Sequence, residues 1–176
     1  MTTVDPEKIK TASELAWIAN AFAESAVRLV ETQENEPLKD YYASRVPMFL
    51  CHHAIELTLK AAILATGVEP PKTHSLQVLT ELCSTVCPIV SIPVPEFLSF
   101  GLTFEDDIFG PQFAKIFFRE LNLHFRYPTS KAMESQIEMA MTREDFLDQL
   151  QTTRPQLFQV LNPLFWNLNE FHAQRF

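Results

Sequence analysis

The stretch "HHAIELTLKAAILATGVEPPKTHSLQVLTEL", residues 52–82, decides the fold. Apolar residues recur in its first half with the spacing of an α-helix, and this half ends at Gly67, a residue type common just beyond a helix C-terminus. Two prolines follow, and Thr73 can then cap a shorter helix that carries leucines from Leu76 onward. The stretch therefore predicts a helix, a tight turn and a second helix.

A polar stripe interrupts the first of these helices. His52, Glu56 and Lys60 are four residues apart and so share one side of the helix. Glu56 precedes Lys60, the better order for an ion pair, which contributes roughly 0.2–0.5 kcal/mol when exposed. The simplest interpretation is a solvent-exposed helix face, and the alternative is a group of side chains that contacts a ligand.

The preceding part of the chain predicts two long helices. Asp5 and Pro6 form a typical helix start, and apolar residues at helical spacing continue from there to an expected end near Glu31. A polar loop follows, and the second helix is expected to run from about Asp40 to the glycine at position 67. Pro47 either kinks this helix or delays its start.

The second half of the chain predicts further helices around a proline-rich crossing loop at 88–95. Residues 96–104 and 111–125 have helical patterns, and Thr142 can cap a final helix with an apolar seam. The expected fold is therefore all-α, an antiparallel up-and-down four-helix bundle with short accessory helices. We expect residues 1–176 to form a single domain.

Composition limits the class of protein. Hydrophobic residues make up 47% of the 176-residue chain and charged residues 20%, which is typical of a globular protein. The polar stripe interrupts the most hydrophobic segment, so we expect no membrane span. The first ten residues lack the apolar core of a signal peptide, which predicts a cytoplasmic protein. A net charge of −8 argues against a surface that binds nucleic acid everywhere, so any RNA site must be local.

The order of motifs resembles that of the HEPN domain family. In that family the second helix is typically an alanine-rich run with an acidic residue and "LKA", followed by glycine, a proline turn and Thr-His before a leucine. This chain has "AIELTLKAAILATG", "PP" and "THSLQVL" in that order. The similarity is clearest over about residues 41 to 82, and "FRYP" and the final helix match more loosely.

The resemblance implies a helical bundle that often dimerises and is associated with RNA or nucleotides. The family includes metal-independent ribonucleases of toxin and defence systems, and also non-catalytic domains that accompany nucleotidyltransferases. The ribonuclease branch carries an arginine and a histidine separated by four to six residues, and Arg119 and His124 have this spacing. The residue after the arginine is usually Asn, Asp or His in that branch, whereas this chain has Glu120 there. The implied partners are RNA or a nucleotide, a second copy of the chain, and a nucleotidyltransferase or antitoxin.

The chemistry of this pair suits RNA cleavage without a metal ion. A histidine can take a proton from the ribose 2′-hydroxyl and return one to the leaving oxygen, while a guanidinium stabilises the negative charge on the phosphorane. On an ideal helix Arg119 and His124 are about 140° apart, so both must reach a shared cleft. Alternatively, Glu120 holds His124 within its own helix. Arg126 and Tyr127 either hold the RNA strand or pack at the bundle end.

Other polar residues give weaker signals. Lys60 and His52 are candidate substrate-binding residues beside the catalytic pair. Cys51, His52 and His53 are consecutive and point in different directions, so we expect no metal site and no cofactor. The three cysteines include no CxxC pair and are expected to be reduced. His74 is expected to cap or pack the short helix.

Overall fold

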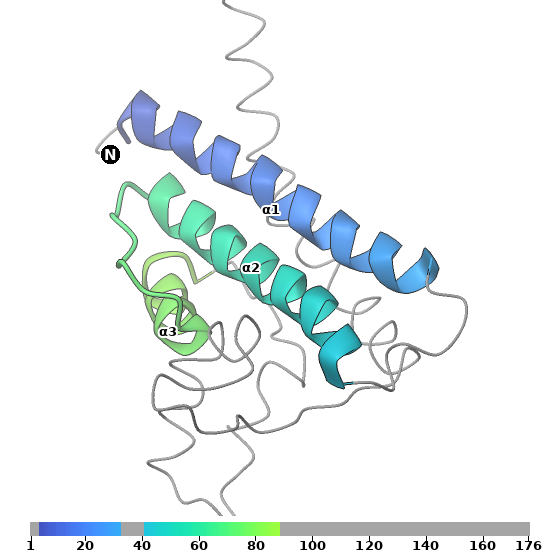
Figure 1. Cartoon of the computed structure of the whole chain (residues 1–176). Helices are drawn as coiled ribbons and strands as arrows, with labels where there is room; N and C mark the ends of the chain where they lie inside the picture. Colours follow the sequence, from blue (N-terminus) through green and yellow to red (C-terminus); the bar gives the residue numbers. More distant parts are fainter. Residues whose placement is uncertain (1–3, 33–40, 89–176) are drawn as a thin grey trace, which may run out of the picture.

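The computed structural model describes residues 4–32 and 41–88, and all regular structure in these segments is α-helical. Helix α1 comprises Pro6–Thr32, α2 comprises Tyr41–Ala65 and α3 comprises Leu76–Val86. Helix α2 lies between α1 and α3 (Figure 1). These helices confirm the three expected in this part of the chain. The helices expected at 96–104, at 111–125 and after Thr142 lie outside the described residues.

Helix α1 begins as its sequence predicts. The side-chain carboxylate of Asp5 accepts a hydrogen bond from the backbone N–H of Glu7 at 3.0 Å. The backbone carbonyl of Asp5 accepts one from the N–H of Ile9 at 3.2 Å. Pro6 occupies the first helical position, where no backbone N–H is needed. The buried face of α1 is formed mainly by alanines. Small side chains allow close approach of a second helix, and the alanines contact Leu57, Ala61 and Leu64 of α2.

Helices α1 and α2 are antiparallel (Figure 1). At one end, the ammonium of Lys8 donates a hydrogen bond to the carbonyl of Gly67 at 2.7 Å. Farther along, the ring of Phe22 packs edge-on against His53 with ring centroids 4.6 Å apart. Gly67 has a φ of 88°, a left-handed conformation that glycine adopts without strain, and it ends α2 as predicted.

Helix α2 is the core helix of the described residues. Pro47 lies inside α2, so the alternative that this proline delays the start of the helix is wrong. By length and composition, Val46–Ala65 could cross a membrane, and the polar stripe does not lower its hydropathy below that level. However, 72% of this segment is buried inside the protein, as expected for the central helix of a bundle.

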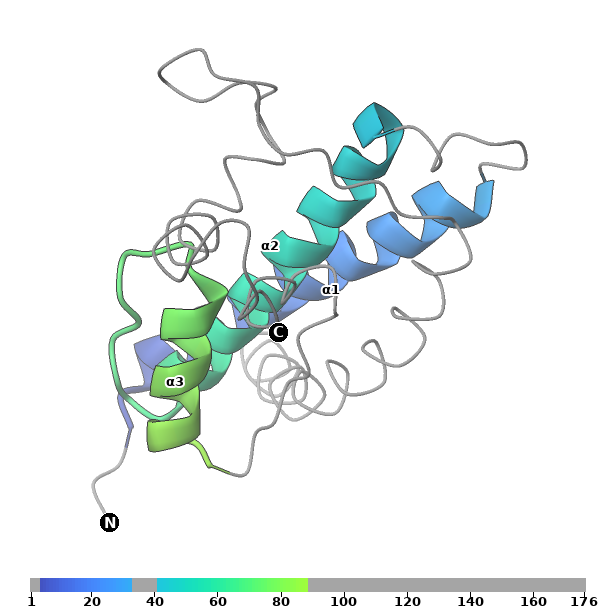
Figure 2. The same ribbon diagram turned by 90° about the horizontal axis from the view of Figure 1, so that it is seen from below.

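Helix α3 lies beside the C-terminal half of α2 (Figure 2). Its N-cap is Ser75, whose hydroxyl accepts a hydrogen bond from the N–H of Val78 at 3.4 Å. The predicted cap, Thr73, is wrong because the helix begins at Leu76, immediately after Ser75. Thr73 instead stabilises the turn: its hydroxyl accepts from the N–H of Ser75 at 3.1 Å. Both hydroxyls fix the backbone on either side of His74.

Candidate functional site

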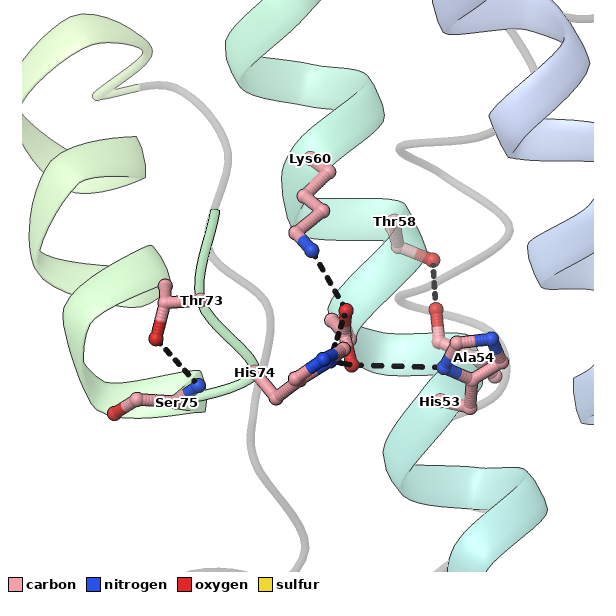
Figure 3. Close-up of polar contacts among 8 residues, drawn as sticks. His53, Ala54, Thr58, Lys60, Thr73, His74 and Ser75 are labelled. Carbon is pink, nitrogen blue, oxygen red and sulfur yellow. Dashed lines mark hydrogen bonds and ion pairs between the residues drawn. The ribbon is translucent and has the colours of Figure 1, made fainter. Parts of the chain in front are cut away.

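A buried carboxylate organises the polar side chains between α2 and α3. The side chain of Glu56 is 2% exposed. Its Oε1 accepts a hydrogen bond from the ammonium of Lys60 at 2.7 Å, and Nδ1 of His74 lies 3.0 and 3.1 Å from its two oxygens. Nδ1 of His53 lies 3.5 Å from Oε2. We call Glu56, Lys60, His74 and His53 the Glu56 cluster; in Figure 3 the labelled Lys60, His53 and His74 converge on one carboxylate.

The predicted solvent-exposed face of α2 is therefore wrong. Glu56 and His52 are each 1% exposed, and the side chain of Lys60 is 17% exposed. The helical spacing placed these residues on one side correctly, but that side faces the turn before α3. The Glu56–Lys60 pair is therefore partly buried and does not belong to the class of weak surface ion pairs.

The environment of Glu56 keeps it ionised. Burial alone would raise the pKa of this carboxyl, but hydrogen bonds from His53, Lys60 and His74 and the charge of Lys60 outweigh burial and lower the pKa to about 2. Glu56 is consequently a carboxylate at neutral pH. Its negative charge is balanced by the ammonium of Lys60.

His53 connects the Glu56 cluster to α1. Besides facing Glu56, its ring packs against Phe22 of α1 and stacks on Phe49 with ring centroids 5.8 Å apart and an interplanar angle of 8°. This position between two aromatic rings explains why His53 is only 28% exposed. His53 therefore has a packing role between α1 and α2.

His52 lies in the core, about 100° around α2 from His53. Burial lowers its pKa to about 4, so the imidazole is neutral at physiological pH. At 1% exposure, its position does not support the predicted role in substrate binding. Burial likewise raises the pKa of the neighbouring Cys51 to about 12, which keeps the thiol protonated. Within the two described segments, no group of histidine, cysteine or acidic residues could hold a metal ion.

The other predicted site residues fall in a different part of the chain. Arg119, His124, Arg126 and Tyr127 lie outside the described residues. Lys60 belongs to the Glu56 cluster and is partly accessible.

Sequence reasoning missed the position of His74. Its side chain is 56% exposed and reaches from the turn before α3 to the carboxylate on α2 (Figure 3). The signal for this arrangement was the pattern Thr-His-Ser, in which two hydroxyl residues that favour capping flank the histidine. The hydroxyls satisfy the turn, so the histidine is left to contact another helix.

The helices and their buried polar cluster define an all-α bundle protein. The chain belongs to the HEPN domain family, which matches residues 12–154. This family is a helical bundle associated with RNA and nucleotides, and it includes ribonucleases. Comparisons with curated proteins and with solved structures gave no match.

Proposed function

We propose that the protein is an endoribonuclease of the HEPN family, in which Arg119 and His124 cleave RNA without a metal ion. The observation that carries this proposal is the family match to residues 12–154, which includes both residues. The four residues between them agree with the spacing in the ribonuclease branch that the sequence resembles. A role in a cytoplasmic toxin or defence system belongs to the same proposal.

Each residue has a defined role in this reaction. His124 takes the proton of the ribose 2′-hydroxyl, and the 2′-oxygen then attacks the adjacent phosphorus. The bond from phosphorus to the 5′-oxygen breaks, His124 returns its proton to this oxygen, and a cyclic phosphate remains on the other product. Arg119 stabilises the negative charge that builds up on the phosphate oxygens. Arg126 and Tyr127 hold the neighbouring nucleotides.

A non-catalytic function is the second candidate. In the Glu56 cluster a carboxylate already accepts hydrogen bonds from Lys60 and His74, which weakens their attraction for phosphate. Glu120 would similarly compete with phosphate for Arg119, and the net charge of the chain is −8. Under this proposal the bundle binds a nucleotide or a partner protein such as a nucleotidyltransferase or antitoxin.

RNA cleavage in the presence of EDTA separates the two functions. Purified wild type should produce fragments that end in a cyclic phosphate, and His124→Ala should not. His172→Ala is a matched control, because this histidine lies beyond residue 154, where the family match ends. Equal background cleavage by wild type and His124→Ala, across RNAs of varied sequence, would refute the ribonuclease.

Dimer formation is a separate part of the proposal. The family resemblance implies a homodimer, in which a second copy could complete the cleft that holds the arginine and the histidine. Sedimentation equilibrium at micromolar concentration tests it. A monomeric mass would contradict the dimer.

A further inference from the structure

The Glu56 cluster determines which ring nitrogen of His74 donates a hydrogen bond to the carboxylate. Glu56 is ionised, and a carboxylate can only accept hydrogen bonds. Nδ1 of His74, which lies 3.0 Å from Oε1 of Glu56, must therefore carry the proton and donate it. In the neutral form of this imidazole Nδ1 holds the single N–H, so Nε2 retains its lone pair and is a hydrogen-bond acceptor.

The structure also fixes the direction of this acceptor. Nδ1 faces the buried carboxylate, so the opposite edge of the ring, which carries Nε2, is directed away from it. The side chain of His74 is 56% exposed, whereas that of Glu56 is 2% exposed. The hydrogen bonds of Thr73 and Ser75 hold the backbone on both sides of the histidine. His74 is thus a preorganised acceptor at the surface, which reduces the entropy lost on binding a ligand.

A cationic donor lies next to this acceptor. Lys60 Nζ and His74 Nδ1 lie 2.7 and 3.0 Å from the same oxygen, Oε1 of Glu56, so these two nitrogens are at most about 6 Å apart. An ammonium has three N–H donors, and the hydrogen bond to Glu56 accounts for one of them. Because the charges of Lys60 and Glu56 balance, the cluster itself does not repel an anion.

A ribonucleotide offers the complementary pair of groups. Its 2′-hydroxyl is a hydrogen-bond donor, and this hydroxyl is adjacent to the 3′-phosphate, which accepts hydrogen bonds from cations. We infer that His74 and Lys60 form a contact site for one nucleotide of an RNA strand. Nε2 of His74 accepts a hydrogen bond from the 2′-hydroxyl, and the ammonium of Lys60 donates to the adjacent phosphate.

This inference rests on the proposed association with RNA, and it deepens that proposal by assigning RNA recognition to a second site. DNA lacks the 2′-hydroxyl, so the contact to His74 should favour RNA over DNA of the same sequence. The contact to Lys60 should serve both nucleic acids, since both carry the phosphate.

Fluorescence anisotropy with a short labelled RNA, and with the DNA of the same sequence, tests the site at one fixed salt concentration. All proteins carry His124→Ala so that the RNA stays intact. His74→Asn places an amide N–H near the position of Nδ1, so it keeps the donor to Glu56 and removes Nε2. We expect this variant to bind RNA about three- to tenfold more weakly and to bind DNA unchanged. Lys60→Gln keeps a donor to Glu56 without the charge and should weaken both complexes.

The outcomes distinguish this site from the proposed function. If the starting protein binds no RNA, both proposals fail. If it binds RNA and folded His74→Asn binds equally well, the contact site alone is refuted. Should His74→Asn unfold, ¹⁵N spectra of the His124→Ala protein with labelled histidine decide the question. The signal of His74 Nε2 should be that of an unprotonated nitrogen and should shift when RNA is added, and an unchanged signal would overturn the inference.

Discussion

Glu56→Gln removes the negative charge at the centre of the Glu56 cluster while keeping a side chain of nearly the same shape. The pKa of Glu56 is about 2, below its ordinary value of 4.5, because of its partners. This difference corresponds to about 3 kcal/mol of stability for the ionised carboxylate. The side chain is 2% exposed, so little of this is lost to solvent screening. Removing one partner from a buried ion pair costs about 3–5 kcal/mol in other proteins, a range that includes the value worked out from the pKa of Glu56.

The pH dependence of this contribution has a definite sign. When the pH falls below 4.5, the unfolded chain binds a proton at this carboxyl while the folded protein does not. The stabilisation is therefore complete above pH 4.5 and is lost progressively as the pH falls toward 2. Glu56→Gln has no carboxyl at this position, so its stability should lack this part of the acid dependence.

Urea unfolding followed by far-UV circular dichroism measures the effect at neutral pH. We expect Glu56→Gln to lower the free energy of unfolding by about 3 kcal/mol. Glu69→Gln is the matched control: Glu69 pairs with Lys8 at 3.7 Å, but its side chain is 78% exposed, so the cost should be below about 1 kcal/mol. Equal losses for the two variants would refute the conclusion that burial makes the Glu56 cluster strong.

Three further predictions concern stability. The pKa of His52 is about 4 in the folded protein, against 6.5 ordinarily, so acid protonates the unfolded chain first. Between neutral pH and about pH 5 the free energy of unfolding should therefore fall by about 2 kcal/mol more in wild type than in His52→Leu. Urea midpoints that fall in parallel for the two proteins would contradict this. Ala16→Leu should overpack the contact between α1 and α2 and cost about 1–3 kcal/mol in urea unfolding, whereas Ala21→Leu on the exposed face should change little. Gly67→Ala should lower the free energy of unfolding by about 1–2 kcal/mol, because alanine is strained at a φ of 88°. Steric overlap does not contribute, since the nearest side-chain atoms lie 3.6 Å from an added Cβ. An unchanged melting temperature would refute this.

The sequence was sufficient to predict the helices of the described residues. Asp5 and Pro6 marked the start of α1, Gly67 marked the end of α2, and the leucine spacing located α3. These are local signals, and local rules predict them because each depends on neighbouring residues only.

The sequence was not sufficient to predict the environment of the polar stripe. Helical spacing shows that Glu56 and Lys60 share a side of α2, but it does not show which part of the chain covers that side. In the structure His74, 18 residues from Glu56 in the sequence, contacts that side of α2. The same limit explains the error about the cap: Thr73 and Ser75 have similar capping preferences, and only the position of the first helical turn distinguishes them.

The alanine face of α1 has a consequence for how the two long helices align. Alanines form a shallow, repetitive surface, so sliding α1 along α2 by one turn, about 5.4 Å, would present a nearly equivalent surface to Leu57 and Leu64. Such a slide would break the 2.7 Å hydrogen bond from Lys8 to Gly67 and move Phe22 away from His53. The polar contact at the end of the helix pair and the aromatic contact along its length therefore both oppose a change of register, while the alanines between them let the two helices approach closely.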